Sequence, residues 1–210
     1  KNNTTRSFNN VMGRSAGKGI EDGNDNVCIG DYTGFSISSG DDNTCLGKYA
    51  GQAGTALTTG SNNTLIGHDA DAGSATLSNT IVLGDSNITA LNCNVQTISA
   101  LSDQRDKTAI EDLDVGLDFI KKMRPVKFTW NRRDGTFLNR KDVGFIAQEL
   151  SEVEMDFNTT DRTRMVNFEN PSKLTASPMQ SYPILIKAIQ ELSAKVDSLQ
   201  AEDNKLKTGG

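Results

Sequence analysis

A serine and a lysine lie five residues apart in the segment Ser102-Asp103-Gln104-Arg105-Asp106-Lys107. A serine hydroxyl attacks an amide only when an adjacent base takes its proton, and lysine supplies that base in Ser-Lys variants of the catalytic triad. Such a lysine must be neutral, so its pKa has to fall from about 10.4 through burial or nearby positive charge. The pair therefore predicts a nucleophile, Ser102, and a general base, Lys107.

Geometry limits how these two side chains can meet. In a regular α-helix, residues five apart point about 140° away from each other. A contact within one chain therefore requires a loop or irregular turn, and a lysine from a neighbouring chain is the alternative. A third interpretation is a surface turn in which Ser102 or Asp103 caps a helix and Lys107 is solvated. Arg105 either helps to lower the pKa of the lysine or holds a carboxylate.

The composition of the chain changes at this segment. Residues 1–101 contain 14 of the 19 glycines, no proline and 14 charged residues, whereas residues 102–210 contain 5 glycines, all 4 prolines and 35 charged residues. Two modules with different physical character therefore meet here, and we expect a domain boundary between residues 101 and 102.

The overall composition narrows the class of protein. Hydrophobic residues make up 35% and aromatic residues 6% of the chain, which is lean for a globule and favours an elongated shape or burial shared between subunits. The net charge of −5 argues against nucleic acid or an anionic membrane as partner. No apolar run approaches the roughly 20 residues of a membrane span, so we expect no membrane insertion. Because the chain begins at Lys1, we expect it to be part of a longer protein.

Cysteine and histidine are sparse. The three cysteines, Cys28, Cys45 and Cys93, do not form a disulfide framework, and Cys28 and Cys45 are expected to be small buried apolar side chains. His68 is the only histidine and lies in a repeat loop. Because no Cys/His cluster with ligand spacing exists, we expect no metal and no cofactor.

The first module is a repeat in which a polar residue, any residue and two apolar residues precede a glycine. The repeat glycines are Gly13, Gly30, Gly47, Gly67 and Gly84, spaced 17, 17, 20 and 17 residues apart. A fixed period of this length predicts a solenoid in which each repeat supplies one short strand. A flexible linker is the alternative, but a linker has no reason to place apolar residues at fixed offsets.

One strand cannot form a core alone, so stacked turns, and three chains around one axis, are expected to bury the apolar pairs in inward-facing layers. These pairs are Val11/Met12, Cys28/Ile29, Cys45/Leu46, Leu65/Ile66 and Val82/Leu83. After Gly84 the period fades, and apolar residues recur every three or four positions at Ile88, Leu91, Val95 and Ile98. Residues 85–101 are therefore either a slender stem or further strand.

The sequence of the second module predicts an α+β fold. Leu113, Leu117 and Ile120 form one helical face, with Asp112 or Asp114 available as the cap. After Pro125, the alternation of Val126, Phe128 and Trp130 with polar residues predicts a half-buried strand, with Trp130 more suited to a core than to a ligand platform.

The C-terminal segment, about residues 183–206, is predicted to be a long helix. Apolar residues step by four and three through Leu185, Ile189, Leu192, Val196, Leu199 and Leu206, with Asp203 in one core position. This heptad period favours a self-associating coiled coil, and the alternative is a single helix packed on its own domain.

Both modules resemble known families. Residues 9–84 resemble the head repeats of trimeric bacterial surface adhesins and the shafts of phage tail fibres and tailspikes. From Ser102 onward the chain resembles the intramolecular chaperone auto-processing domain of endosialidase-type phage tailspikes, tail fibres and neck appendages. Four blocks carry this second resemblance, namely Ser102–Lys107 with Ile110, residues 117–130, Gly144–Leu150 and Tyr182–Leu192.

The resemblance implies a fold class and an activity. The expected fold is mixed, with an N-terminal all-β trimeric solenoid in residues 1–101 and an α+β chaperone domain in residues 102–210 that ends in the coiled-coil helix. The expected activity is that of a serine peptidase acting once on its own chain, with a Ser102–Lys107 dyad that cuts Leu101–Ser102. Asp103, Arg105, Gln148 and Glu149 are candidate supporting residues.

The resemblance also implies the biological setting. We expect a homotrimer that is assembled in the host cytoplasm, releases its chaperone fragment and remains in the virion as a tail fibre or spike. Upstream domains of the same protein would carry receptor binding, with a glycan on the host surface as the expected receptor class.

Two alternatives compete with this interpretation. The first is a trimeric adhesin stalk that is never cut and keeps its coiled coil as an anchor. The second is a membrane-tethered transcription factor that releases itself through a similar domain, which the repeats and the absence of a basic region disfavour. An enzyme acting on external substrates has least support.

Overall fold

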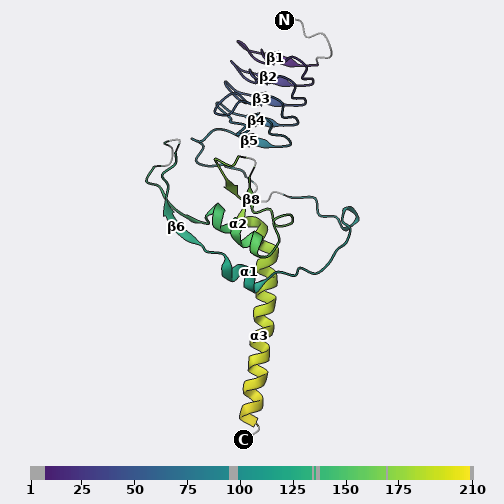
Figure 1. Cartoon of the computed structure of the whole chain (residues 1–210), viewed down its shortest axis with the longest axis vertical. Coiled ribbons are helices and arrows are strands. Elements are labelled where there is room, and N and C mark those ends of the chain that lie inside the picture. The colour runs from purple at the N-terminus through teal and green to yellow at the C-terminus, as the bar shows by residue number, and fades with distance from the viewer. Residues whose placement is uncertain (1–7, 95–98, 134, 136–137, 169, 209–210) are drawn as a thin grey trace. The chain divides into compact units, whose positions relative to one another are not determined.

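The computed structural model describes residues 8–94, 99–133, 135, 138–168 and 170–208 (Figure 1). The chain forms two compact units, Lys1–Asn92 with Asn131–Leu138 and Cys93–Trp130 with Asn139–Gly210. The first is a β-solenoid of about four turns, and the second is a mixed α/β region that ends in a long helix. Among the described residues, no helix combines the length and apolar character that a membrane crossing requires.

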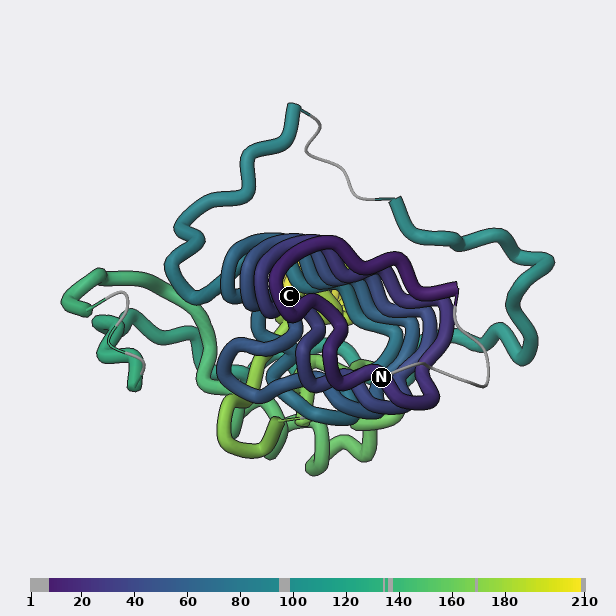
Figure 2. The backbone as a smooth tube through the Cα atoms, turned by 90° about the horizontal axis from the view of Figure 1, so that it is seen from above, coloured from purple at the N-terminus to yellow at the C-terminus, as the bar shows by residue number. Residues whose placement is uncertain are grey.

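The solenoid has one short strand per repeat, as the sequence predicts. The strands are β1 (Asn10–Met12), β2 (Val27–Ile29), β3 (Thr44–Leu46), β4 (Thr64–Ile66) and β5 (Ile81–Leu83). They form a parallel sheet in chain order. In this sheet Cys28 pairs with Val11 on one side and with Cys45 on the other, and Cys45 pairs in turn with Leu65. Viewed from above, the successive turns lie over one another (Figure 2).

Buried asparagines connect consecutive turns. The Nδ2 groups of Asn26, Asn43 and Asn63 donate to the carbonyl oxygens of Gly40, Gly60 and Leu77 at 2.8, 2.9 and 2.6 Å. Each Oδ1 accepts from the backbone N–H of the polar residue one turn later in the same ladder, which ends at Thr80. Every asparagine in this ladder therefore satisfies backbone groups that the solenoid takes away from water.

The repeat glycines are required by contacts between turns. Gly30 has a φ of +131°, and a Cβ at this position would lie 2.7 Å from the carbonyl carbon of Gly47 one turn below. An L-side chain would be strained there by both its backbone conformation and its lack of space.

The two members of each apolar pair lie on opposite faces of the solenoid wall. The first member points into the solenoid of its own chain, where Cys28, Cys45 and Leu65 are fully buried beside Ile37 and Leu57. The second member points outward, and Ile29, Leu46 and Ile66 remain 37–42% exposed. The two members differ because side chains alternate between the two faces of a strand. Stacked turns of one chain therefore bury the first members, and burial of the second members between chains stays a prediction.

The segment after β5 contains neither helix nor strand among its described residues. Ile88 and Leu91 are exposed there, while Val95 and Ile98 lie outside the described residues. Cys93 is exposed, in contrast to the buried Cys28 and Cys45.

The second unit packs short elements around Phe119. Its elements are η1 (Gln104–Asp106), α1 (Leu117–Lys122), the antiparallel pair β6 (Val126–Thr129) and β7 (Lys141–Gly144), α2 (Ala147–Asp156), the pair β8 (Val166–Asn167) and β9 (Thr175–Ala176), η2 (Pro178–Ser181) and α3 (Tyr182–Thr208). Val115, Val153, Met165 and Ile184 are buried with Phe119. Trp130 is 37% exposed and its Nε1–H donates to Asp142, so the expected burial of Trp130 is wrong.

The expected aspartate cap of α1 is also wrong. The helix begins later than predicted, at Leu117, and the Leu117 N–H donates to Glu191 Oε2 of α3 at 2.8 Å. A carboxylate at this position satisfies a free N–H and complements the positive end of the helix. Asp114 is instead paired with Arg162, which lowers the pKa of Asp114.

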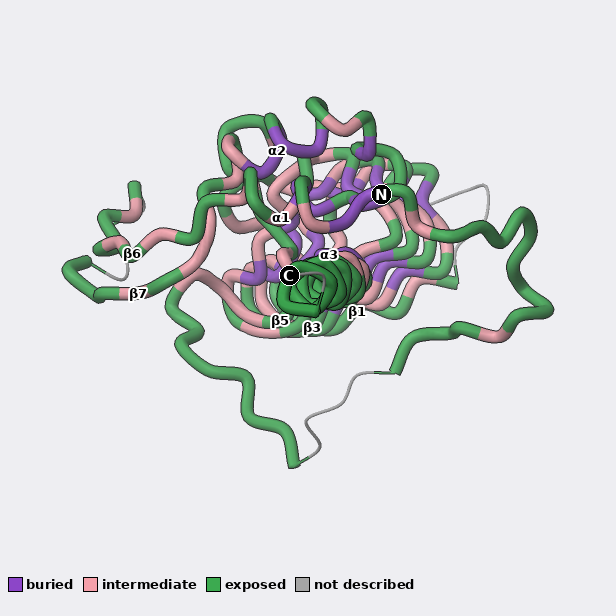
Figure 3. The backbone as a smooth tube through the Cα atoms, turned by 90° about the horizontal axis from the view of Figure 1, so that it is seen from below, coloured by how far each residue is buried: buried purple, intermediate pink, exposed green. Residues whose placement is uncertain are grey.

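Helix α3 has a buried side and an exposed side. Ile184 and Ala188 are buried in the unit, and Glu191 caps α1 on the same side. From Ile189 onward the heptad seam is uncovered, with Ile189, Leu192, Val196 and Leu199 exposed by 43–66%. Most of α3 is coloured as exposed in Figure 3. Within the described residues, α3 packs on its own unit near its start, and self-association of the exposed seam stays a prediction.

Candidate functional site

The segment from Ser102 to Lys107 forms a single tight turn. Asp103 is extended, with φ −67° and ψ 136°, and its Oδ1 accepts from the Arg105 N–H at 2.9 Å. One turn of 3-10 helix follows at Gln104–Asp106, and Lys107 is extended again. This is a local N-cap arrangement, because an aspartate before a helical turn accepts from a free N–H two residues later.

The turn brings the two candidate catalytic residues together. Lys107 Nζ lies 2.7 Å from Ser102 Oγ, which is hydrogen-bonding distance. As an ammonium, the lysine donates to the serine oxygen, and a neutral amine at the same distance would be placed to take the serine proton. The geometry that an α-helix forbids is thus reached within one chain by a 3-10 turn between two extended residues.

The site is open in the single chain. Ser102 and Lys107 are both exposed, and Leu101, which precedes the serine, is 83% exposed. Water therefore reaches both the candidate nucleophile and the peptide bond before it. A lysine becomes a base near neutral pH when burial or neighbouring positive charge destabilises its ammonium form, and the single chain supplies little burial.

Arg105 binds its neighbour Asp103. Its Nε and Nη2 atoms donate to the two carboxylate oxygens of Asp103 at 3.0 and 2.6 Å. These bonds lower the pKa of Asp103 and raise the pKa of Arg105. Of the two roles that the sequence left open for Arg105, holding a carboxylate is the one present here. The pair closes the turn and leaves the lysine opposite the serine.

Gln148 and Glu149 belong to helix α2 and not to the turn of residues 102–107. Both are in the first turn of α2, where Glu149 forms an ion pair with Arg124 and raises the pKa of the Arg124 guanidinium. Among the described residues, no hydrogen bond joins Gln148 or Glu149 to Ser102 or Lys107. In the single chain Glu149 links α2 to the segment before β6, and a supporting role at the turn stays a prediction.

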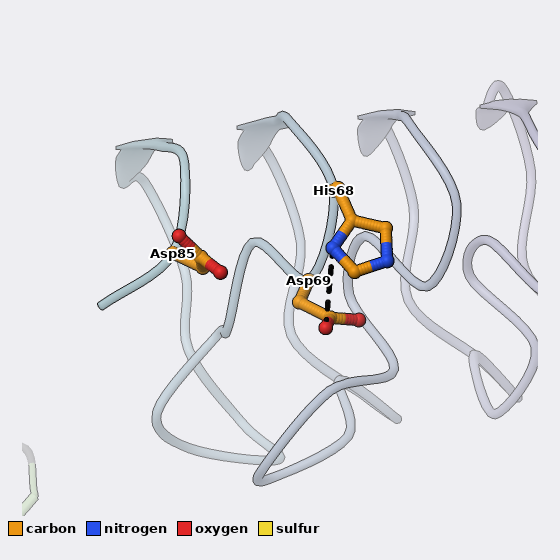
Figure 4. Close-up of side chains that lie close together, drawn as sticks. All are labelled: His68, Asp69 and Asp85. Atoms are coloured by element: carbon orange, nitrogen blue, oxygen red, sulfur yellow. Dashed lines mark ion pairs between the residues drawn. The ribbon is translucent and has the colours of Figure 1, made fainter. Parts of the chain in front are cut away.

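A group of possible metal ligands lies in the solenoid, where the sequence predicted none. One ligand atom each from His68, Asp69 and Asp85 lies within 4.8 Å of the others, and His68 Nδ1 is 3.2 Å from Asp69 Oδ2 (Figure 4). His68 and Asp85 meet because their separation of 17 residues equals one turn. The repeat period was the signal that could have found them. His68 is exposed and the two aspartates are only half-buried.

Comparison with known families gives a match for part of the chain. The family model described as the chaperone of endosialidase matches residues 102–159. The match supports an endosialidase-type intramolecular chaperone domain in this part of the chain. The match begins at Ser102 and ends before α3. No curated protein matches the chain.

This family defines the general role of the domain. It supports a chaperone of a phage tail fibre or tailspike and implies a self-cleaving peptidase. It also suggests a trimeric phage tail protein located in the virion. The β-solenoid agrees with a fibre shaft.

Proposed function

We propose that residues 102–210 trimerise and fold the β-solenoid, and then release themselves by cutting Leu101–Ser102. The observation that carries the proposal is the 2.7 Å contact between Lys107 Nζ and Ser102 Oγ at the first residue of the family match. The change in composition after residue 101 supports the same boundary.

The chemistry follows from the position of the serine beside the bond it breaks. Neutral Lys107 takes the proton of Ser102 Oγ, and Oγ attacks the carbonyl carbon of Leu101. The C–N bond breaks, the lysine returns the proton to the leaving nitrogen, and Leu101 is left as an ester on Ser102. Water then hydrolyses the ester, giving a Leu101 carboxylate and a new amino terminus at Ser102. Because the backbone already holds Oγ next to the carbonyl, the attack requires little further loss of conformational entropy.

Cleavage is expected to wait for assembly. The single chain leaves Ser102 and Lys107 in water, whereas a neighbouring chain packed over the turn would bury the lysine and favour its neutral form. Helix α3 carries an uncovered heptad seam that can bring such neighbours. We therefore place trimerisation before the cut, so that cleavage follows correct folding and removes the template.

The biological consequence is a fibre that keeps its shaft and loses its chaperone. We propose that the fibre assembles in the host cytoplasm. We also propose that upstream domains of the mature fibre bind a glycan receptor on the host surface. Peptide mapping of virions should then find residues 1–101 without residues 102–210. Equal recovery of both parts from virions would contradict release.

The decisive experiment measures the mass and amino terminus of freshly made chain. The wild-type chain should give a fragment that begins Ser-Asp-Gln-Arg, and Ser102→Ala should leave an uncut trimer. Cutting of Ser102→Ala, or an amino terminus at another residue, would refute the dyad. An uncut wild-type trimer would instead favour the adhesin stalk that retains its coiled coil.

A second variant tests the link to assembly. Leu192→Asp places a charge in the exposed seam of α3, so it should prevent association and block cutting although Ser102 and Lys107 are unchanged. Glu202→Lys, also an exposed charge change on α3 but outside the seam, is the control and should cut normally. Efficient cutting in monomeric Leu192→Asp would leave the dyad in place and remove the dependence on assembly.

A further inference from the structure

The outward face of the β1–β5 sheet is lined by two columns of side chains. The third residues of the strands form an apolar column with 37–69% exposure, namely Met12, Ile29, Leu46, Ile66 and Leu83. The first residues form the second column, which consists of Asn10, Val27, Thr44, Thr64 and Ile81. We call these ten positions the outer sheet face.

This face contains no charged side chain. The column that follows the repeat glycines is made entirely of ionisable residues, Arg14, Asp31, Lys48, His68 and Asp85. Charge is therefore present immediately beside the outer sheet face and absent from it. An uncharged surface that carries an apolar column and lies beside a charged column has the character of an interface core with a polar rim.

We propose that parallel copies of this chain pack against one another through the outer sheet face. The inference rests on the proposed trimer and names the surface that the shaft uses. Apolar rows recur at the strand spacing of about 4.8 Å, and a parallel copy presents the same rows at the same intervals. Every row then meets an apolar row, whereas a partner without this period would match few of them. The exposed seam of α3 is a second surface for self-association on the same chain.

The described face is joined on the same chain by a second candidate surface for self-association. The described strands contribute ten side chains to the face, and a standard interface takes roughly 20–30 residues from each partner. The exposed α3 seam adds further apolar side chains to the same association.

The periodicity of the face also limits its specificity. A copy displaced by one strand still matches four of the five rows. Repetitive faces of this kind specify register weakly, because shifted arrangements bury nearly the same side chains. The face therefore supplies packing, and the trimerising domain must supply the alignment.

Cysteine cross-linking of the full chain tests the surface independently of cleavage. In a Ser102→Ala, Cys93→Ser background, Ile66→Cys lies on the outer sheet face, and Thr59→Cys is exposed on another side of the same turn. Cys28 and Cys45 are buried and stay in both variants. Under a mild oxidant, Ile66→Cys should form covalent dimers at least tenfold faster than Thr59→Cys.

The outcomes separate this inference from the trimer itself. A trimeric mass by light scattering without preferential Ile66→Cys cross-linking would overturn the proposed surface and leave the trimer standing. A monomeric mass would overturn both. Adding Leu192→Asp should reduce the Ile66→Cys link severalfold, because the aligning helix is lost, and an undiminished link would refute the assignment of register to the chaperone domain.

Discussion

Asn43 offers the sharpest test of how the solenoid is held together. Its Nδ2 donates to the buried Gly60 carbonyl at 2.9 Å, and its Oδ1 accepts from the Asn63 N–H at 3.1 Å. Asn43→Ala removes both partners and leaves two backbone groups unsatisfied between turns. At about 1–3 kcal/mol for each group, the local free energy of unfolding should fall by about 2–6 kcal/mol.

Hydrogen exchange measured by mass spectrometry is the suitable assay, because it reports opening of the solenoid separately from the second unit. For peptides covering residues 60–66, a loss of 2–6 kcal/mol predicts exchange that is faster by about 30-fold to more than 10,000-fold. Asn87→Ala removes an exposed amide that bonds only Asp85 and should change exchange by less than about 0.5 kcal/mol.

Asn43→Asp sharpens the test because it keeps the shape and loses the donor. The carboxylate would face the Gly60 carbonyl without a hydrogen atom to share, and burial would raise its pKa. Its destabilisation should be greatest above that raised pKa and should shrink as pH falls and the acid is protonated. An Asn43→Ala chain that exchanges within about 0.5 kcal/mol of the parent would refute the ladder as a source of stability.

The other predictions concern the turn, the α1 cap and the chaperone role. Lys107→Arg should abolish cutting as completely as Lys107→Ala, because arginine keeps its proton in this pH range, and persistent cutting by mass spectrometry would remove Lys107 as base. In the Ser102→Ala chain, NMR titration should give the Asp103 carboxyl a pKa below its ordinary value of about 3.9, because Arg105 stabilises the carboxylate. The carboxylate should therefore stabilise the turn above about pH 3.9, and this stabilisation should be lost as the pH falls through the lowered pKa of Asp103. Arg105→Ala should raise the pKa of Asp103. Glu191→Ala should destabilise the second unit by about 1–3 kcal/mol in urea because it leaves the Leu117 N–H unpaired, whereas an unchanged midpoint would deny the cap any role. Residues 1–101 expressed alone should be less soluble than the same residues released from the full chain, and equal thermal resistance of the two preparations would argue against a chaperone.

Local patterns in the sequence predicted the architecture well. The 17-residue spacing of the repeat glycines led to the solenoid with one strand per repeat. The structure adds the parallel register, in which each strand pairs with the strand of the next repeat. The heptad from Leu185 to Leu206 led to α3, which the structure extends to Tyr182–Thr208. The candidate chemistry was assigned to residues 102–107 because the change of composition and the Ser-Lys spacing coincide there.

Long-range contacts were beyond these patterns. The Glu191 cap of α1 joins residues 74 apart, and nothing in the local sequence of α1 indicates it. The His68–Asp85 proximity was accessible through the repeat period, although a search for ligand spacing along the chain missed it. Gln148 and Glu149 were grouped with the turn by resemblance alone, and the structure pairs Glu149 with Arg124.

The sequence by itself determined the two modules, the repeat, the long helix and the residue types at the junction, because each is written in local periodicity or composition. The tertiary structure decided which member of each apolar pair is buried, since side chains alternate between the two faces of a strand and only the stacking of turns determines which face is inside. It also decided that Ser102 and Lys107 meet within one chain, because the path of a 3-10 turn fixes that distance and residue spacing does not.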